Sequence, residues 1–273
     1  MPSYTDQIGN TITLDGTPRR IVSLVPSQTE LLFDLGLDEE VVGITKFCIH
    51  PSTWFRSKTR VGGTKQLHLE IIRELQPDLI IANKEENVRE QVEALSQKFP
   101  VWTSDVNTLE QALEMIRSIG ELTGPINLAV SLVHKIEEEF SKLRNAISSE
   151  PSLRVTYLIW RDPLMAAGGD NFINEMMLKA GLKNVFEHQP RYPSINIEDL
   201  RQSGCQLLLL SSEPYPFTQK HVDELQPLLP GVRIMLVDGE MFSWYGSRLV
   251  LAPLYFVQLQ NEILSLTDGA RKR

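Results

Sequence analysis

The middle of the chain, residues 124–151, reads GPINLAVSLVHKIEEEFSKLRNAISSEP. Gly124 and Pro125 are typical of a helix start, and the polar run that ends at Pro151 is typical of a helix end. Between them, apolar residues recur at three- and four-residue steps, as one face of a helix requires. These residues are Ile126, Val130, Val133, Ile136, Phe140, Leu143 and Ile147. We therefore predict one helix over residues 126–148, about 35 Å long.

Both flanks of this helix alternate short aliphatic blocks with segments of helical period. The predicted strands are 21–24, 41–44, 79–82, 101–103, 155–160, 207–210 and 233–237. The other predicted helices are 28–35, 69–75, 87–98, 109–122, 171–180, 197–202, 219–225 and 247–266. Buried strands separated by helices favour parallel sheets. We therefore expect an α/β protein with two Rossmann-like lobes, residues 1–123 and 151–273, bridged by a linking helix at 124–150, with a ligand cleft between the lobes.

The first predicted helix carries a start signal and a stop signal. Residues 27–30 read SQTE, which fits a capping box that begins at Ser27, and Gly36 follows the last apolar residue. Two tryptophans, Trp54 and Trp102, are expected to fill the hydrophobic core.

The two halves of the chain resemble each other in two places. Residues 30–37 (ELLFDLGL) are similar to 175–182 (EMMLKAGL), and LEIIR at 69–73 is similar to IEDLR at 197–201. In the second pair, a predicted strand follows each helix at the same distance. The pattern indicates an internal duplication, or else only the likeness that any two amphipathic helix–strand units share.

Length and composition indicate the number of domains and exclude some classes of function. At about 150 residues per domain, 273 residues suffice for two domains. The hydrophobic share of 42% and the charged share of 23% are ordinary for a globular protein. A formal net charge of −8 disfavours nucleic-acid binding. The two cysteines, Cys48 and Cys205, lie far apart in sequence and form no disulfide framework.

The sequence shows neither a membrane-spanning stretch nor a signal peptide. No stretch approaches the roughly 18 to 20 apolar residues that a membrane-spanning helix needs. Asp6, Asn10 and Asp15 interrupt the N-terminal region, where a signal peptide requires an unbroken apolar core. We therefore expect either a cytoplasmic protein or one whose leader was removed before residue 1.

No catalytic motif is present. The sequence lacks G-x-S-x-G, H-E-x-x-H, a Walker loop and G-x-G-x-x-G. Gly62 to Lys65 resemble the end of a phosphate loop but lack its upstream glycine. The small residues at 166–170 indicate a tight turn before a helix more than an anion site. We expect no enzyme.

One pair of metal-ligating residues follows the strand predicted at 41–44. Cys48 and His50 lie in the loop at the carboxyl end of that strand, where open α/β sheets bind ligands. A thiol and an imidazole both ligate soft or borderline metals, but two donors do not complete a site. An axial bond from His50 to a metal held by another chelator needs only one donor. The alternative is a packed thiol and a hydrogen-bonded histidine.

Aromatic and polar residues follow other predicted strands. Aromatic rings would cover the flat faces of a large ligand, and amides, acids and an arginine would contact its polar edges. The expected ligand-binding residues are Ser27, Cys48, His50, Lys65, Asn83, Glu86, Trp160, Asp162, Asp238, Trp244, Tyr245 and Arg248.

Four motifs together resemble a known family. They are PRRIVSLVPSQTE at 18–30, VGG at 61–63, LE at 69–70 and QPDLI at 76–80. In combination they resemble the helical-backbone metal receptors, the class III substrate-binding proteins of ABC importers, from about Thr5 to about Ser265. The resemblance implies a monomeric receptor with no intrinsic cofactor. Its ligand would be a metal chelate such as cobalamin, a ferric siderophore or haem.

The resemblance also implies a protein partner. In this family, one glutamate on each lobe docks into arginine pockets of the membrane permease. The LE motif assigns the first to Glu70, and the similar helix assigns the second to Glu198. The alternative is that each is an exposed first-turn acid that the helix dipole stabilises. The resemblance places the protein in the periplasm or at the cell surface, whereas the missing leader leaves the cytoplasm open.

Two other functions remain open on the sequence. One is a cytoplasmic carrier or sensor for a corrinoid or another tetrapyrrole, and a leader in the upstream coding sequence would favour the receptor over it. The other is a chelatase-like enzyme, which would need an acid/base pair. His50 with Glu85 or Glu86 is the candidate pair.

Overall fold

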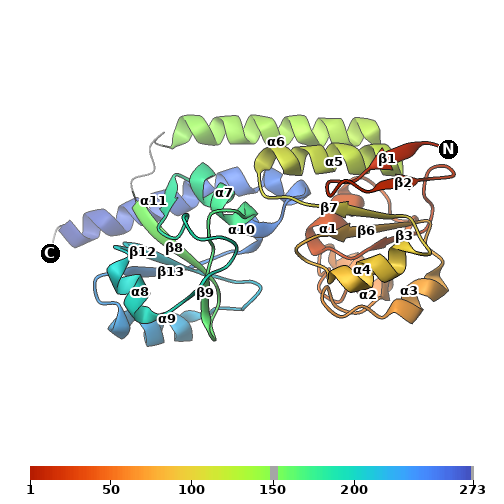
Figure 1. Ribbon diagram of the computed structural model, residues 1–273. Helices are drawn as coiled ribbons and strands as arrows, with labels where there is room; N and C mark the ends of the chain where they lie inside the picture. The colour runs from red at the N-terminus through yellow and green to blue at the C-terminus, as the bar shows by residue number, and fades with distance from the viewer. Residues whose placement is uncertain (148–152, 272–273) are drawn as a thin grey trace. The chain divides into compact units, whose positions relative to one another are not determined.

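The computed structural model describes residues 1–147 and 153–271, and it divides into two compact units (Figure 1). Unit 1 comprises Met1–Val106, Glu110–His134 and Tyr245–Arg248. Unit 2 comprises Asn107–Leu109, Lys135–Trp244 and Leu249–Arg273. The chain passes from unit 1 to unit 2 within helix α6 (Ile126–Ala146), and a short segment near residue 245 belongs to unit 1 again.

The centre of unit 1 is a five-stranded parallel sheet. Its order is β5-β4-β3-β6-β7, built from β3 (Ile21–Ser23), β4 (Val41–Ile44), β5 (Thr59–Arg60), β6 (Leu79–Asn83) and β7 (Val101–Ser104). Every residue of β3, β6 and β7 is buried, as in parallel strands covered on both faces. The strand order reverses between β3 and β6. The predicted parallel sheet is confirmed.

Five helices belong wholly or mostly to unit 1. They are α1 (Pro26–Asp34), α2 (Ser52–Ser57), α3 (Leu69–Leu75), α4 (Arg89–Ser96) and α5 (Leu109–Thr123). Trp54 and Trp102 are each 1% exposed, so both fill the core as predicted. The Phe33 ring meets Trp54 edge-on, with ring centroids 5.4 Å apart.

The structure corrects the start of α1 and confirms its end. The helix begins at Pro26, and its N-cap is Val25, with no side-chain cap. Proline at the first helical position has a suitable φ, so the predicted capping box at Ser27 is wrong. At the other end, Gly36 has φ 79°. The amides of Gly36 and Leu37 donate to the carbonyls of Phe33 and Leu32, which forms a Schellman motif.

An N-terminal hairpin lies beside the sheet of unit 1 and was not predicted. Its strands β1 (Ser3–Thr5) and β2 (Thr11–Thr13) are antiparallel. The Asp6 carboxylate accepts the amides of Ile8 and Asn10 in the turn, at 3.1 and 2.7 Å. It also accepts the amide of Thr103, which joins the hairpin to the edge strand β7.

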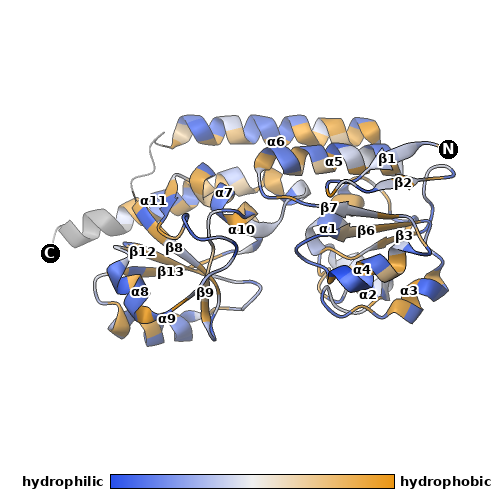
Figure 2. Ribbon diagram, viewed as in Figure 1, coloured by the Kyte–Doolittle hydropathy of each residue, from blue (hydrophilic) through white to orange (hydrophobic). Residues whose placement is uncertain are grey.

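The long helix α6 confirms the prediction, with one difference in its first turns. Polar and apolar residues alternate along it (Figure 2). Val133, Ile136, Phe140 and Leu143 are buried, but Ile126 and Val130 are half exposed. In those first turns Ala129 is buried instead, because Gly120 of α5 has no side chain to hold it away. The predicted helix end, Ser148 to Pro151, lies outside the described residues.

Unit 2 contains a second, mixed sheet. Its order is β11-β9-β8-β12-β13, with β10 also on β8; the strands are β8 (Leu153–Trp160), β9 (Leu164–Ala166), β10 (Leu182–Asn184), β11 (Ser194–Ile195), β12 (Leu207–Ser211) and β13 (Arg233–Val237). β8 is parallel to β10 and β12, and β12 is parallel to β13. The strand order reverses between β8 and β12. The antiparallel strands β9 and β11 are too short for a periodic signal and were missed.

Helices cover both faces of this sheet. On one face, Leu158, Leu208 and Leu210 share a buried cluster with Leu200 of α8 (Ile197–Gln202) and Leu225 of α9 (Gln219–Leu225). On the other face, aromatic rings from α10 (Glu240–Ser243) and α11 (Ala252–Arg271) extend the core. The Phe242 ring contacts Tyr157 and Phe256 in tilted arrangements, with ring centroids 5.0 and 4.9 Å apart. Helix α7 (Phe172–Lys179) packs against β10.

The last predicted helix, 247–266, is divided in two. A 3₁₀ turn at Ser247–Val250 precedes α11, which begins at Ala252 with Pro253 in its first turn. None of the described helices is long and apolar enough to cross a membrane.

Candidate functional site

Each sheet has a point where its strand order reverses. In open α/β sheets, ligands bind outside the carboxyl ends of strands at such a point. In unit 1 the point lies between β3 and β6, and in unit 2 it lies between β8 and β12.

Asn83 organises the edge of unit 1. It is 2% exposed, and its amide nitrogen donates to the Ser104 hydroxyl at 3.0 Å. Its amide oxygen accepts the backbone amides of Glu85 and Glu86, at 2.8 and 2.9 Å. Since every polar atom of this side chain is engaged, Asn83 shapes the loop after β6.

Two further side chains hold neighbouring loops to this edge. Asn87 donates to the carbonyls of Leu24 and Thr64, at 3.3 and 3.1 Å, and so joins the loop after β6 to the end of β3. Lys65 is exposed, and its ammonium donates to the Glu85 carbonyl at 2.6 Å. These hydrogen bonds fix the backbone of the loop after β6, which carries the half-buried side chains of Glu85 and Glu86.

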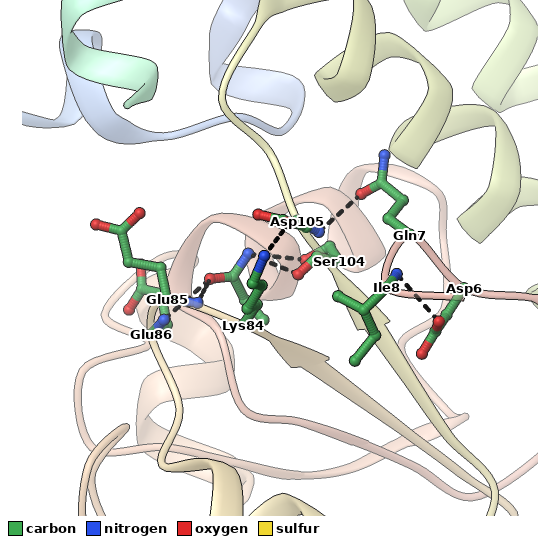
Figure 3. A network of polar contacts seen from close by, with 9 residues as sticks. Asp6, Gln7, Ile8, Lys84, Glu85, Glu86, Ser104 and Asp105 are labelled. Carbon is green, nitrogen blue, oxygen red and sulfur yellow. Dashed lines mark hydrogen bonds and ion pairs between the residues drawn. The ribbon is translucent and has the colours of Figure 1, made fainter. Parts of the chain in front are cut away.

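A polar network continues from this edge toward the N-terminal hairpin (Figure 3). Lys84 pairs with Asp105 at 2.6 Å, and the Asp105 amide donates to Gln7 at 3.1 Å. The network lies along a groove of about 1060 Å³ between the hairpin, α4 and β7. Of the expected ligand-binding residues, only Asn83 lines this groove among the described residues.

The loop after β4 contains two exposed apolar residues that sequence reasoning missed. Phe47 is 51% exposed and Ile49 is 45% exposed, on either side of buried Cys48. The Lys46 ammonium lies 5.1 Å from the centre of the Phe47 ring. His50 follows in the same loop and is half-buried. Apolar residues directly after a buried strand were the available signal for this surface.

Cys48 lies in the core of unit 1. The thiol is fully buried, and the hydroxyls of Thr29 and Thr45 each lie 3.1 Å from its sulfur. Burial raises the pKa of the Cys48 thiol, which disfavours the thiolate that a metal would need. Cys48 is therefore a core residue. Among the described residues, no group of three or more His, Cys, Asp or Glu side chains is arranged to hold a metal ion.

Arg248 forms an ion pair inside unit 1. Its guanidinium donates two hydrogen bonds to Glu30, at 2.9 and 2.5 Å, and both side chains are mostly buried. A Cβ on Gly246 would lie 2.5 Å from the Ser27 carbonyl, so the segment packs directly on the first turn of α1. Ser27 and Tyr245 are buried at 3% and 6% exposure. Glu30 and Ser27 thus contact the short segment Tyr245–Arg248, which belongs to unit 1.

In unit 2, Trp160 is the most accessible of the predicted aromatic residues. It ends β8, is 40% exposed, and donates its indole N–H to the Asp162 carbonyl at 3.2 Å. The side chain of Asp162 is exposed. The Tyr215 ring lies edge-on to Trp160, with centroids 5.6 Å apart. Tyr215 follows β12, so the pair lies at the point where the strand order reverses.

Trp244 differs from the open aromatic face that was expected. It is 5% exposed, and its indole N–H donates to Glu213 at 2.8 Å, beside the Ser243 hydroxyl at 2.5 Å. Burial raises the pKa of the Glu213 carboxyl. Asp238 is half-buried and accepts the amide of Glu240 at 3.1 Å. These residues brace the loop after β13.

Glu70 and Glu198 occupy equivalent positions in the two units. Each is the second residue of a short helix, and each pairs with the arginine three residues later, Arg73 or Arg201. Their side chains are 80% and 59% exposed. Hydrogen bonds from Gln202 and Arg201 lower the pKa of the Glu198 carboxyl. Both acids are therefore placed on the surface.

A family model for periplasmic binding proteins matches residues 21–226, which is most of both sheets. The chain belongs to the periplasmic binding protein family. Members of this family are binding proteins rather than enzymes.

One relative and two solved structures show how similar this chain is to known proteins. The vitamin B12-binding protein of Pectobacterium carotovorum is 24% identical over 93% of this chain and 91% of its own length. The periplasmic haem-binding protein of Vibrio cholerae has a TM-score of 0.75 at 20% identity, over 88% of this chain and 98% of that one. A structure from the ABC-type Fe³⁺-hydroxamate transport system of Saccharomonospora viridis has a TM-score of 0.73 at 19% identity, over 94% and 98%. The two structures share the fold of this periplasmic binding protein.

Proposed function

We propose that this protein is the substrate-binding receptor of an ABC importer for a metal chelate. The ligands named for its relatives, vitamin B12, haem and Fe³⁺-hydroxamate, have one feature in common. Each is a metal ion held by an organic chelator. The observation that carries the proposal is the family match together with exposed aromatic residues, Phe47 and Trp160, at the carboxyl edge of each sheet.

His50 is the candidate for an axial bond to the metal of such a chelate. It follows exposed Ile49 in the loop after β4, and neutral imidazole is a common donor to iron and cobalt. One donor is enough, because the chelator supplies the others. The protein itself needs no resident cofactor.

The permease is the second proposed partner. Glu70 and Glu198 are exposed carboxylates in the first turns of equivalent helices. A carboxylate at such a site stays charged and can accept two hydrogen bonds from an arginine of another protein. We propose that these two acids contact the permease and that the protein works as a monomer.

An absorbance and tryptophan-fluorescence titration tests the function. Purified protein is titrated with aquocobalamin, haemin and a ferric hydroxamate, and with an amino acid and a sugar as controls. Saturable binding of one chelate at micromolar concentration or below is expected. An axial bond from His50 would shift the absorbance bands of the bound chelate, and His50→Ala would remove that shift. Tight binding of a control, with none of the three chelates bound, would contradict the proposal.

A further inference from the structure

Four side chains form an aromatic cluster at the switch point of the unit 2 sheet. They are Trp160, Tyr215, Phe217 and His221. Tyr215 lies at the centre, with ring centroids 5.6, 4.8 and 5.4 Å from the other three. Trp160 ends β8, Tyr215 and Phe217 follow β12, and His221 lies on α9.

The hydrogen bonds of His221 determine where its ring proton lies. The backbone amide of Thr218 donates to Nδ1 at 2.9 Å. A backbone amide can only donate, so Nδ1 carries the lone pair. Neutral imidazole then holds its proton on Nε2. Because Nε2 lies 3.1 Å from the Tyr215 hydroxyl oxygen, the histidine is the donor in that contact and Tyr215 is the acceptor.

This direction leaves the hydroxyl hydrogen of Tyr215 for another acceptor. Among the side chains that the structure describes, His221 is the only hydrogen-bond partner of that hydroxyl. The ring itself is only partly buried. Trp160 beside it has a 40% exposed side chain, and its indole is held by the Asp162 carbonyl. An exposed aromatic side chain and an oriented donor therefore lie side by side.

The charged residues around the cluster have no excess of positive charge. Arg161 pairs with Glu224, and Lys220 lies 3.8 Å from the same carboxylate. Asp223 on α9 accepts a hydrogen bond from Gln219. With the exposed Asp162 beside Trp160, three carboxylates lie around the cluster with two cations, so the cluster offers a hydrogen bond without a net positive field. A neutral carbonyl can be recognised here as well as a carboxylate.

We propose that Tyr215, oriented by His221, donates a hydrogen bond to a carbonyl or carboxylate oxygen at the rim of the bound chelate, while Trp160 packs against the chelate. The inference rests on the proposed function and names a further specificity-determining residue for it. Tyr215 is a ligand-binding residue in this scheme, and His221 is a positioning residue that acts through it.

Nitrogen-15 NMR tests the orientation without any ligand. In labelled protein above pH 7, a long-range proton–nitrogen spectrum identifies which ring nitrogen of each histidine is protonated. His221→Phe assigns the His221 signals by their loss. A protonated Nε2 and a lone-pair Nδ1 support the proposal, and the opposite tautomer overturns it.

Titration of variants tests the ligand contact. Tyr215→Phe should weaken binding of the chelate by about ten-fold, the effect of one hydrogen bond. Tyr4→Phe, a matched hydroxyl deletion in the hairpin of unit 1, should leave binding unchanged. His221→Phe should weaken binding less, and adding it to Tyr215→Phe should cost nothing further. Aquocobalamin has amides at its rim and haemin has carboxylates, so the chelate that is affected identifies the acceptor.

Three outcomes separate the two proposals. Unchanged affinity in Tyr215→Phe, with wild-type binding intact, overturns this inference alone. A loss in Tyr215→Phe that His221→Phe deepens additively overturns the positioning role of His221. No binding of either chelate or of a ferric hydroxamate by the wild type overturns the proposed function and the ligand contact together, while the NMR result still decides the tautomer.

Discussion

At the scale of single residues, Arg248 shows how a side chain acquires its role from its neighbours. In sequence it is an arginine after an aromatic loop, typical of a ligand contact. In the structure it forms a two-point ion pair with Glu30, more than 200 residues earlier. A mostly buried carboxylate that loses its partner is left desolvated and unpaired.

Arg248→Ala is therefore expected to lower the free energy of unfolding by about 3 kcal/mol, measured by urea denaturation. The double variant Glu30→Ala/Arg248→Ala should lose at least about 1 kcal/mol less than the sum of the single variants. Arg201→Ala is the control, because its pair with Glu198 is exposed and worth less than about 1 kcal/mol. Equal stability of the Arg248→Ala and Arg201→Ala variants would contradict a structural role for Arg248.

At the scale of elements, helix α1 is followed by Gly36, a position where a side chain would strain the backbone. Gly36 has φ 79°, and an added Cβ would meet no atom within 4 Å. The cost of a side chain at this position is therefore conformational and not steric crowding. L-residues in this left-handed region are strained by about 1–2 kcal/mol.

Gly36→Ala should accordingly lower the free energy of unfolding by about 1 kcal/mol in a denaturation experiment. Gly16→Ala serves as the matched control, since Gly16 also has open space around it but no left-handed φ. The Gly16 variant should be as stable as the wild type or slightly more stable. A larger loss in Gly16→Ala than in Gly36→Ala would show that the Schellman motif does not stabilise α1.

At the scale of the whole molecule, equivalent helix–strand units recur in both halves. α3 with β6 and α8 with β12 each present a glutamate at the second helical position, followed by its arginine. The caps differ, since Asn196 and Asp199 form a capping box on α8 whereas α3 has no side-chain cap.

The double variant Glu70→Ala/Glu198→Ala should abolish association with the permease, measured by co-purification from membranes. The melting temperature and chelate affinity should not change, because both side chains are exposed. Glu74→Ala/Glu262→Ala removes two other exposed acids and should associate normally. If the Glu70/Glu198 variant loses ligand instead, these acids belong to the binding site. Normal association of the Glu70→Ala/Glu198→Ala variant with the permease would contradict a docking role for these two acids.

The sequence by itself predicted most of the regular structure. The segments at β3, β6 and β12 are short and mostly apolar, and α6 has apolar residues at helical spacing. Both patterns can be recognised from residues that are close together in the sequence. The N-terminal hairpin was missed because its short polar strands depend on the Asp6 turn and on contact with β7.

Only the tertiary structure decided which candidate residues face outward. Cys48 and Trp244 lie in loops next to predicted strands, yet both are buried, because distant elements cover them. Phe47 was not predicted as a surface residue, and Tyr215 lies in segment 211–217, which follows a predicted strand; both are more accessible than Cys48 and Trp244. The strand order brings the ends of β8 and β12 together, and with them Trp160 and Tyr215. The spacing of apolar residues predicts which face of a helix or strand is buried. The contacts of a single side chain depend on how the helices and strands pack together, which the local sequence does not contain.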